Sequence, residues 1–279
     1  MERDGEHRNQ QVNAKYVQFF DETKLSAFVN WSDRKEVDYQ DMSKEMISRL
    51  GYDWDNYYPD WNKAVNSSQG TWSSGETSVW DAYYSASGLR EDLLTGATLD
   101  AKMSDKLRWK TTVYNHTNKG TGLWWTPAVL SPVTGTPSVR TTEYDINRSG
   151  LLSSLTYALG NHKINGGFWY ENDDFAQARR YYATSLTDPR SPYDTPSNPF
   201  RTDWDFDYEE KTLQWYAQDT ITVSPALTLN VGFKSPRVEI TGTEKTGADR
   251  PSGTITSEES FLPQLGLVYK YDGSNELFA

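Results

Sequence analysis

The chain has no cysteine and only three histidines in 279 residues. The absence of cysteine excludes disulfide frameworks, thiolate metal sites and thiol nucleophiles, and it suits an envelope compartment in which stray thiols would be oxidised. The histidines, His7, His116 and His162, are far apart in the sequence. None of them has a second ligand at a metal-binding spacing. We therefore expect no metal site and no cofactor.

Positive charge is scarce, since 28 Lys and Arg face 39 Asp and Glu, for a formal net charge of -11. No basic run occurs, which argues against nucleic acid as a partner because phosphate binding needs clustered cations. Long apolar runs are also missing, so no segment approaches the roughly 18 residues of a transmembrane helix. The first ten residues lack the apolar core and cleavage site of a signal peptide. We expect this chain to be one piece of a longer protein.

Aromatic residues, by contrast, are abundant. The chain has 11 Trp, 18 Tyr and 10 Phe, although its mean hydropathy is only -0.78. A disordered polar chain has few such rings. Membrane β-barrels carry Trp and Tyr in girdles at both interfaces, and soluble β-proteins that bind sugars expose aromatic rings as well. The composition leaves both classes open.

Apolar and polar residues alternate in about ten segments, which predicts β-strands with one apolar face. The alternation is clear from Leu25 to Trp31 and again from Leu107 to Val113. Asp219 breaks it in a later segment. Opposite to the apolar residues we expect Asp100, Lys110 and Lys234 on a wet, polar face. The segments are joined in pairs by short turns near 21–24, 104–106, 160–163, 224–226 and 272–275.

Between these hairpins lie long polar stretches, roughly at 36–88, 119–138, 184–203 and 244–253. The first should contain a helix from Met42 to Leu50, whose apolar residues fall at helical spacing. A Greek-key sandwich mixes short and long connections at both ends, so this arrangement favours an up-and-down meander. We predict an all-β fold, an antiparallel up-and-down meander of about ten strands. It would form part of a transmembrane β-barrel with short periplasmic turns and long extracellular loops.

Several phrases of the sequence resemble the barrel of TonB-dependent receptors of Gram-negative bacteria, over nearly the whole length and in barrel order. They are Arg8-Asn9-Gln10-Gln11, Val37-Asp38-Tyr39-Gln40-Asp41-Met42, Gly232-Phe233-Lys234-Ser235, Phe261-Leu262-Pro263-Gln264-Leu265-Gly266 and Asn275-Glu276-Leu277-Phe278-Ala279. The resemblance implies a place in the bacterial outer membrane, in contact with its lipid. It also implies energy-coupled uptake of a scarce small molecule, such as a siderophore-iron complex, a vitamin or an oligosaccharide.

In that family the TonB energy-transducing complex acts through a plug domain inside the barrel. The resemblance therefore implies that residues 1–279 are a partial barrel domain, with the plug, the signal peptide and the C-terminal strands lying outside this chain. The competing hypothesis is a soluble extracellular, aromatic-rich β-protein that binds carbohydrate. Such a protein would fold in buffer without detergent.

No catalytic arrangement emerges from the sequence, which has no nucleophile elbow, phosphate loop or dinucleotide fingerprint. We expect no enzymatic activity and no catalytic residue. Asp203, Asp205 and Asp207 alternate along a strand entry, which would place three carboxylates on one face. They could bind calcium, but a solvated or lumen-facing strand is the preferred interpretation.

Aromatic residues in the predicted extracellular loops are the candidates for ligand contact. They could stack against a sugar ring or an aromatic siderophore, although loop packing and interface anchoring are the simpler roles for such rings. The candidates are Trp72, Trp80, Tyr83, Tyr84, Trp124 and Trp125.

Overall fold

The computed structural model describes residues 7–247 and 251–279 as one eleven-stranded sheet with three short helices at one end. The strands are β1 (His7–Phe20), β2 (Thr23–Val37), β3 (Ala86–Lys102), β4 (Leu107–Leu130), β5 (Pro137–Leu159), β6 (His162–Tyr182), β7 (Arg201–Ser224), β8 (Leu227–Thr246), β9 (Gly253–Glu258), β10 (Leu262–Lys270) and β11 (Glu276–Phe278). The helices are α1 (Lys44–Leu50), α2 (Trp61–Ser68) and the 3-10 helix η1 (Val79–Asp81).

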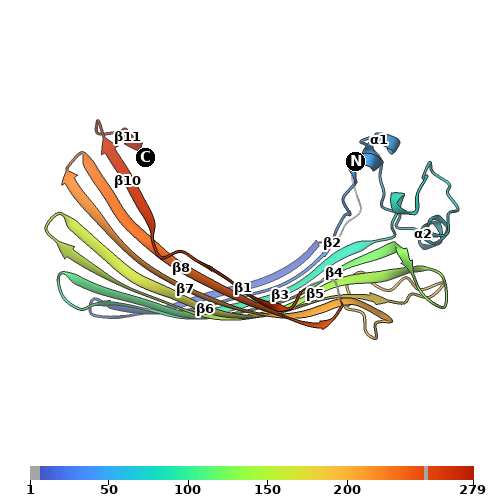
Figure 1. Ribbon diagram of the computed structural model, residues 1–279, viewed down its shortest axis with the longest axis horizontal. Coiled ribbons are helices and arrows are strands. Elements are labelled where there is room, and N and C mark those ends of the chain that lie inside the picture. Colours follow the sequence, from blue (N-terminus) through green and yellow to red (C-terminus); the bar gives the residue numbers. More distant parts are fainter. Residues whose placement is uncertain (1–6, 248–250) are drawn as a thin grey trace.

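Neighbouring strands pair antiparallel in chain order from β1 to β8, then β10 and β11, and β9 adds a second partner to β8. The predicted up-and-down meander is confirmed. Figure 1 shows a curved, open sheet with the short hairpin turns at one end and the helices and long loops at the other. β9 was not predicted, and it directly follows the predicted loop at 244–253. Residues 248–250 of that loop lie outside the described residues. No helix of the described residues is long and apolar enough to cross a membrane.

The strand register separates the sheet into two chemically different faces, because residues directly opposite each other share a face. Val113 lies opposite Ala97 and Leu151, and Leu151 lies opposite Tyr170. We call this the apolar face, and it contains the alternating residues that the sequence predicted. Asp100 and Lys110 pair on the other, polar face, as predicted, and Lys234 lies on that face too.

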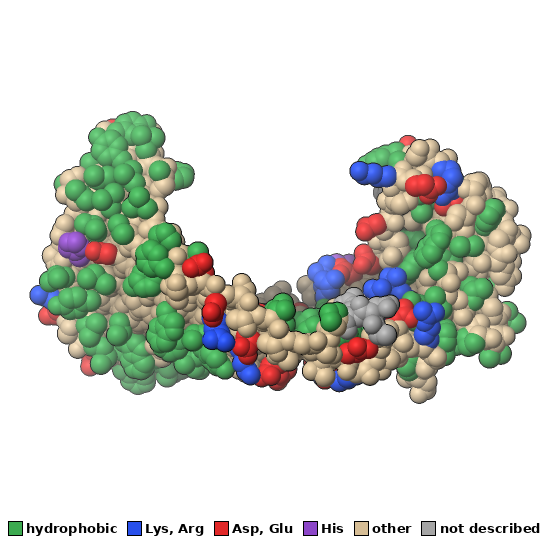
Figure 2. Space-filling view, viewed as in Figure 1, with side chains coloured by type: hydrophobic (Ala, Val, Ile, Leu, Met, Phe, Trp, Pro, Cys, Tyr) green, Lys and Arg blue, Asp and Glu red, His purple; other side chains and the backbone are tan. Residues whose placement is uncertain are grey.

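Large side chains of the apolar face are uncovered. Val113 is 51% exposed and Trp215 is 52% exposed. Figure 2 shows hydrophobic side chains crowding the arm of the sheet that carries the short turns. A continuous exposed apolar surface of this kind needs a partner phase such as lipid. The soluble carbohydrate-binding alternative gives no account of it.

Along β4, the uncharged part of the apolar face has the length of a membrane-spanning strand. On β4 it runs from Leu107 to Thr117, and the first charged residue is Lys119, which pairs with Asp145 on β5 at 3.1 Å. A tilted spanning strand needs roughly 9–11 residues. Because β4 continues to Leu130, the strands extend well beyond the uncharged band.

This extension corrects one prediction. The stretch at 119–138 was expected to be a loop because it is rich in Thr, Gly and Pro, but only 131–136 lies outside strands. Pairing continues along it, with Lys119 opposite Asp145 and Thr126 opposite Ser138. Polar residues remain in a strand when both neighbouring strands satisfy their backbone groups, and the sequence of one strand does not reveal this.

The predicted helix at 42–50 is confirmed as α1, which begins after Ser43, whose side chain accepts from the Met46 amide at 3.0 Å. The sequence analysis missed α2. Its N-cap is Asp60, whose carboxylate accepts from the Lys63 amide at 3.1 Å. Asp at the N-cap after a proline is a recognisable start signal, and Trp61, Ala64 and Val65 fall at helical spacing, but a helix of eight residues is too short for this spacing to stand out among the polar residues around it.

Candidate functional site

The loop between β2 and β3 is held together by a clamp between α1 and η1. Arg49 on α1 donates from Nη1 to Asp81 Oδ2 at 2.7 Å and from Nη2 to Asp81 Oδ1 at 2.8 Å. The backbone amides of Thr77 and Ser78 also donate to Asp81, at 2.8 and 2.9 Å. Burial acts to raise the pKa of this carboxyl, but these hydrogen bonds outweigh it and leave the pKa below its ordinary value. The clamp fixes the position of Trp80, the residue before Asp81.

A second tie in the same loop involves Tyr58, whose hydroxyl donates to Glu76. The ammonium of Lys63 lies 3.7 Å from the centroid of the Tyr58 ring. Burial and the bond to Glu76 together raise the pKa of Tyr58. Trp54 adds a bond from its indole nitrogen to the Asp81 carbonyl at 2.9 Å. Tyr58 and Trp54 are therefore used in the loop's own packing.

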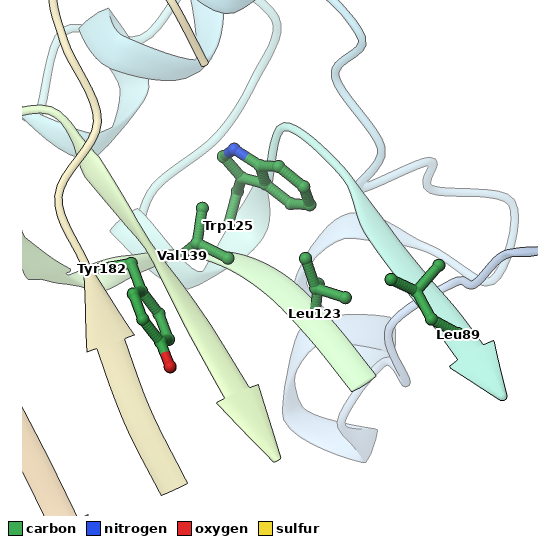
Figure 3. Close-up of a cluster of buried hydrophobic side chains, with 5 residues drawn as sticks. All are labelled: Leu89, Leu123, Trp125, Val139 and Tyr182. Carbon is green, nitrogen blue, oxygen red and sulfur yellow. The ribbon is translucent and has the colours of Figure 1, made fainter. Parts of the chain in front are cut away.

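At the loop end of the sheet, the apolar face is covered by a buried cluster that we call the loop core. It consists of Leu89, Leu123, Trp125, Val139 and Tyr182, shown in Figure 3. Trp61 of α2 and Tyr84 pack against it. Trp125 is completely buried, and its indole nitrogen donates to the Pro189 carbonyl. Trp61 donates to the Leu186 carbonyl at 3.0 Å, so the loop core anchors the 183–200 loop to the wall.

On the polar face of the same strands lies a different group, which we call the arginine-tryptophan patch: Trp80, Trp124, Arg140, Arg179 and Trp204. Trp80 stacks on Trp124 with ring centroids 6.2 Å apart and an interplanar angle of 21°. The Arg140 guanidinium lies 4.3 Å from the centroid of Trp124, its direct cross-strand partner. Arg179 lies 5.4 Å from the centroid of Trp204 on β7. Trp80 is 55% exposed, so a solute can reach the patch.

The patch has two cations that lack a carboxylate partner. Among the described residues, neither Arg140 nor Arg179 forms an ion pair. Arg179 Nε and Trp124 Nε1 are buried without a hydrogen-bond partner there, and Arg179 Nη2 reaches only the Thr142 hydroxyl at 3.5 Å. Guanidinium and indole N–H groups are donors only. The patch therefore presents positive charge and aromatic surface to whatever lies in front of the polar face.

The six predicted contact residues do not form one site. The structure brings Trp80 and Trp124 together on the polar face. Trp125 belongs to the loop core on the opposite face, and the ring of Tyr84 packs against it with centroids 5.9 Å apart. Tyr83 is buried and accepts from the Gln40 amide at 3.2 Å. Trp72 donates to the Ser67 carbonyl at 3.2 Å within its own loop. Ligand contact by any of the six stays a prediction.

The location of two of these residues was predicted wrongly. Trp124 and Trp125 lie in β4, not in a loop, because they pair with Arg140 and Val139 on β5. Being adjacent in a strand, they point to opposite faces. Sequence reasoning also missed Arg140 and Arg179, which lie on neighbouring strands. Their proximity depends on the register of β4, β5 and β6, and no signal within one strand reports it.

The three aspartates at the start of β7 do not share a face. Arg180 pairs with Thr202 and Arg179 pairs with Trp204, so Asp203 is an extra residue at a β-bulge. Each carboxylate has a cation of its own: Asp203 with Arg201 at 2.6 Å, Asp205 with Arg180 at 2.5 Å and Asp207 with Lys245 at 2.6 Å. No group of three or more His, Cys, Asp or Glu able to hold a metal occurs in the part of the chain that the structure describes.

The fold is similar to that of solved outer-membrane receptors. The siderophore receptor PiuA from Acinetobacter baumannii matches 98% of this chain with a TM-score of 0.62 at 12% identity. The ferric citrate transporter FecA, in its unliganded form, matches 98% of this chain with a TM-score of 0.69 at 13% identity. The chain spans 41% and 35% of the length of these two proteins. At this level of identity the likeness concerns the fold alone.

No curated protein matches the chain. A family model does match, over residues 31–279, and its description is TonB dependent receptor-like, beta-barrel. This match covers most of the sequence and agrees with the meander, the apolar face and the one-sided long loops. It is a family of receptors and transporters of the bacterial outer membrane and not of enzymes. The chain belongs to the β-barrel family of the TonB-dependent receptors.

Proposed function

We propose that this chain is part of the barrel wall of a receptor that takes up an anionic, aromatic iron chelate across the outer membrane. In such a barrel the apolar face contacts lipid and the polar face lines the lumen. The energy for uptake would come from the TonB complex acting through a plug domain. A plug domain and further strands would be supplied by parts of the protein outside residues 1–279.

The observation that carries the ligand class is the pair Arg140 and Arg179. Both guanidiniums lie against tryptophan rings and lack an acidic partner among the described residues. A neutral vitamin or oligosaccharide gives no reason for two cations without a direct ion-pair partner, because it provides no charge to balance them. An anionic chelate with aromatic groups would accept hydrogen bonds from the guanidiniums and stack on Trp80 or Trp204.

The similar structures support this choice, since their names include a siderophore receptor and a ferric citrate transporter. A second pair of arginines on the polar face agrees with it too. Arg34 and Arg90 lie opposite each other on β2 and β3, on the same face and at the same end of the sheet. They share one carboxylate, Glu36, so the positive charge is only partly balanced.

The test is binding and uptake by cells that produce the full-length receptor as their only route for iron chelates. Replacing Arg140 or Arg179 by alanine should weaken binding of an anionic ferric siderophore by about 10- to 100-fold, the size expected when a hydrogen bond to a charged group is lost. Arg237→Ala is the matched control, because Arg237 lies on the apolar face and already pairs with Glu239 at 3.1 Å. Uptake that is unaffected by the first two substitutions would reject the anionic ligand.

A further inference from the structure

Gly122 is an uncovered glycine within a long strand of the polar face. It is exposed, although its neighbours in β4, Thr121 and Leu123, are both buried. It lies two residues before Trp124, so the two residues share a face. A glycine inside a strand weakens the strand, because it has no side chain to pack. Such a glycine marks a bulge, a tight bend or a place where another group approaches the backbone closely.

The described part of the wall does not itself require a glycine at position 122. Pairing continues without a shift on both sides of it, with Gly88 opposite on β3 and Thr142 opposite on β5, which excludes a bulge and a tight bend. A Cβ at Gly122 would meet only the Thr142 carbonyl, at 3.9 Å. At Gly120, by contrast, the Tyr144 ring already occupies the space of a side chain. Close approach by a group in front of the polar face is the reason that remains.

Two aromatic side chains stand on either side of Gly122 along the strand direction. Trp124 is two residues further along β4, and the Tyr144 ring lies over Gly120, two residues before. Two residues of a strand span roughly 7 Å, so one uncovered backbone position separates the two aromatic groups. A planar group can lie flat on this backbone and meet an aromatic ring on each side.

Positive charge borders the same position on the side of β5 and β6. The Arg140 guanidinium lies 4.3 Å from the centroid of the Trp124 ring. Arg179 Nη2 lies 3.5 Å from the hydroxyl of Thr142, the cross-strand neighbour of Gly122. A group that lies on the Gly122 backbone therefore has cations along one of its edges.

The opposite side, toward β3, carries a carboxylate. A Cβ at Gly88 would be 3.3 Å from Glu36 Oε1, so Glu36 lies beside the cross-strand neighbour of Gly122 on that side. Arg34 and Arg90 already pair with this carboxylate. A planar group with negative charge on one edge is consequently oriented, because that edge is attracted toward β6 and repelled from Glu36.

We infer that an aromatic ring of the transported chelate lies flat on the backbone of Gly122, between Trp124 and Tyr144, with its anionic edge toward Arg179. This inference rests on the proposed function and specifies the ligand group: a planar ring with negatively charged oxygens on one edge, as in a catecholate. A chelate that binds iron only through aliphatic carboxylates has no ring to place there and gives no reason for an uncovered glycine. Gly122 thus acts as a specificity-determining residue by leaving this position open.

The test measures binding of a ferric catecholate to cells that produce the full-length receptor. Gly122→Val places a branched side chain on the backbone and lifts the ring away from it, so binding should weaken about tenfold, as expected when an aromatic contact is lost. Gly122→Ala should give a smaller loss in the same direction. Gly266→Val is the matched control, because Gly266 lies on the polar face near the short turns and a Cβ there meets Asn230 Cβ at 3.6 Å.

Stability separates this role from a structural one. Valine is favoured in strands, so Gly122→Val should unfold in urea at the same or a higher concentration than the native receptor while it binds the ferric catecholate less tightly. The heat-dependent gel mobility of a folded barrel would confirm folding of each variant. Equal losses of binding and stability would overturn the inference, because they would show that the substitution only damages the wall.

The remaining outcomes separate this inference from the proposed function. Weaker binding in Arg140→Ala together with unchanged binding in a folded Gly122→Val would overturn the position of the ring and leave the anionic ligand in place. Unchanged binding in both variants, or no binding of the ferric catecholate by the native receptor, would overturn the inference as well. A segment of the plug is the competing occupant of this position. In that case Gly122→Val would admit a large antibiotic that cells with the native receptor exclude, and the inference would be wrong.

Discussion

Tyr114 on β4 lies directly opposite Gly150 on β5, and its ring occupies the space that a side chain at Gly150 would need. A Cβ at that position would be 2.2 Å from Tyr114 Cζ. The reverse arrangement occurs further along the same two strands, where the Tyr144 ring covers Gly120. The Tyr114 hydroxyl donates to Glu171 on β6 and accepts from the Trp169 indole at 3.0 Å. Each glycine thus allows an aromatic ring to lie over the polar face and tie strands together.

Gly150→Ala should therefore displace the Tyr114 ring and break its bonds to Glu171 and Trp169. We expect a loss of about 1–3 kcal/mol in the free energy of unfolding, the usual cost of overpacking a fitted site. Gly122→Ala is the matched control on the same strand pair, since a Cβ there meets only the Thr142 carbonyl at 3.9 Å. Urea unfolding of the full-length barrel in lipid, monitored by gel mobility, measures the free energy of unfolding of both variants. Equal stability of the two variants would contradict this role for Gly150.

The Arg49-Asp81 clamp predicts how the first loop responds to mutation. Asp81→Ala removes the acceptor for Arg49 and for the amides of Thr77 and Ser78, and it should open the loop at residues 38–85. We expect protease cleavage in this loop to be at least about tenfold faster, because local opening becomes easier when its hydrogen bonds are lost. Asp60→Ala, which removes only the N-cap of α2, should have a smaller effect. Identical cleavage rates in both variants would show that the clamp is not what orders the loop.

The same loop should lose order in acid. The pKa of Asp81 lies below its ordinary value of 3.8, and that of Glu76 lies below 4.5. In both cases burial acts in the opposite direction, but hydrogen bonds from Arg49, from Tyr58 and from backbone amides outweigh it. A lowered folded-state pKa contributes stability that is present above the unfolded pKa and is lost as pH falls through the folded value. Hydrogen exchange of residues 38–85 should be constant from pH 7 to about 5, apart from its intrinsic pH dependence, and protection should fall below about 4.

Trp80 and Trp72 provide a direct comparison of two predicted contact residues. Trp80 stacks on Trp124 in the arginine-tryptophan patch, whereas Trp72, 42% exposed, bonds within its own loop. Trp80→Ala should weaken ligand binding several-fold, since an aromatic pair contributes roughly 0.5–1.5 kcal/mol. Trp72→Ala should leave it unchanged. Ligand-induced quenching of tryptophan fluorescence in the full-length receptor measures the binding affinity of each variant. A larger loss of affinity in Trp72→Ala than in Trp80→Ala would place the binding site at the outer part of the loop.

The sequence by itself determined the strands and their two faces. Side chains of a strand alternate with period two, so the pattern from Leu107 to Val113 reports which residues share a face without knowledge of any other strand. Short turns and long loops are equally local, because they follow from where the alternation stops. The loops near 36–88 and 184–203 were predicted on this basis and are confirmed, whereas the stretch at 119–138 was wrongly predicted to be a loop. The α1 helix was predicted from the helical spacing of its apolar residues and is confirmed. The absence of enzymatic activity stays a prediction.

The tertiary structure alone decided which residues meet. Trp124 contacts Arg140 because β4 and β5 remain paired through a polar stretch whose composition is typical of a loop. A bulge of one residue separates Asp203 from Asp205 and removes the shared face that their spacing predicted. His162 reaches Asp219 across 57 positions of sequence. In each case the decisive quantity is the register between strands, which depends on pairing along the entire wall and leaves no mark within a single strand.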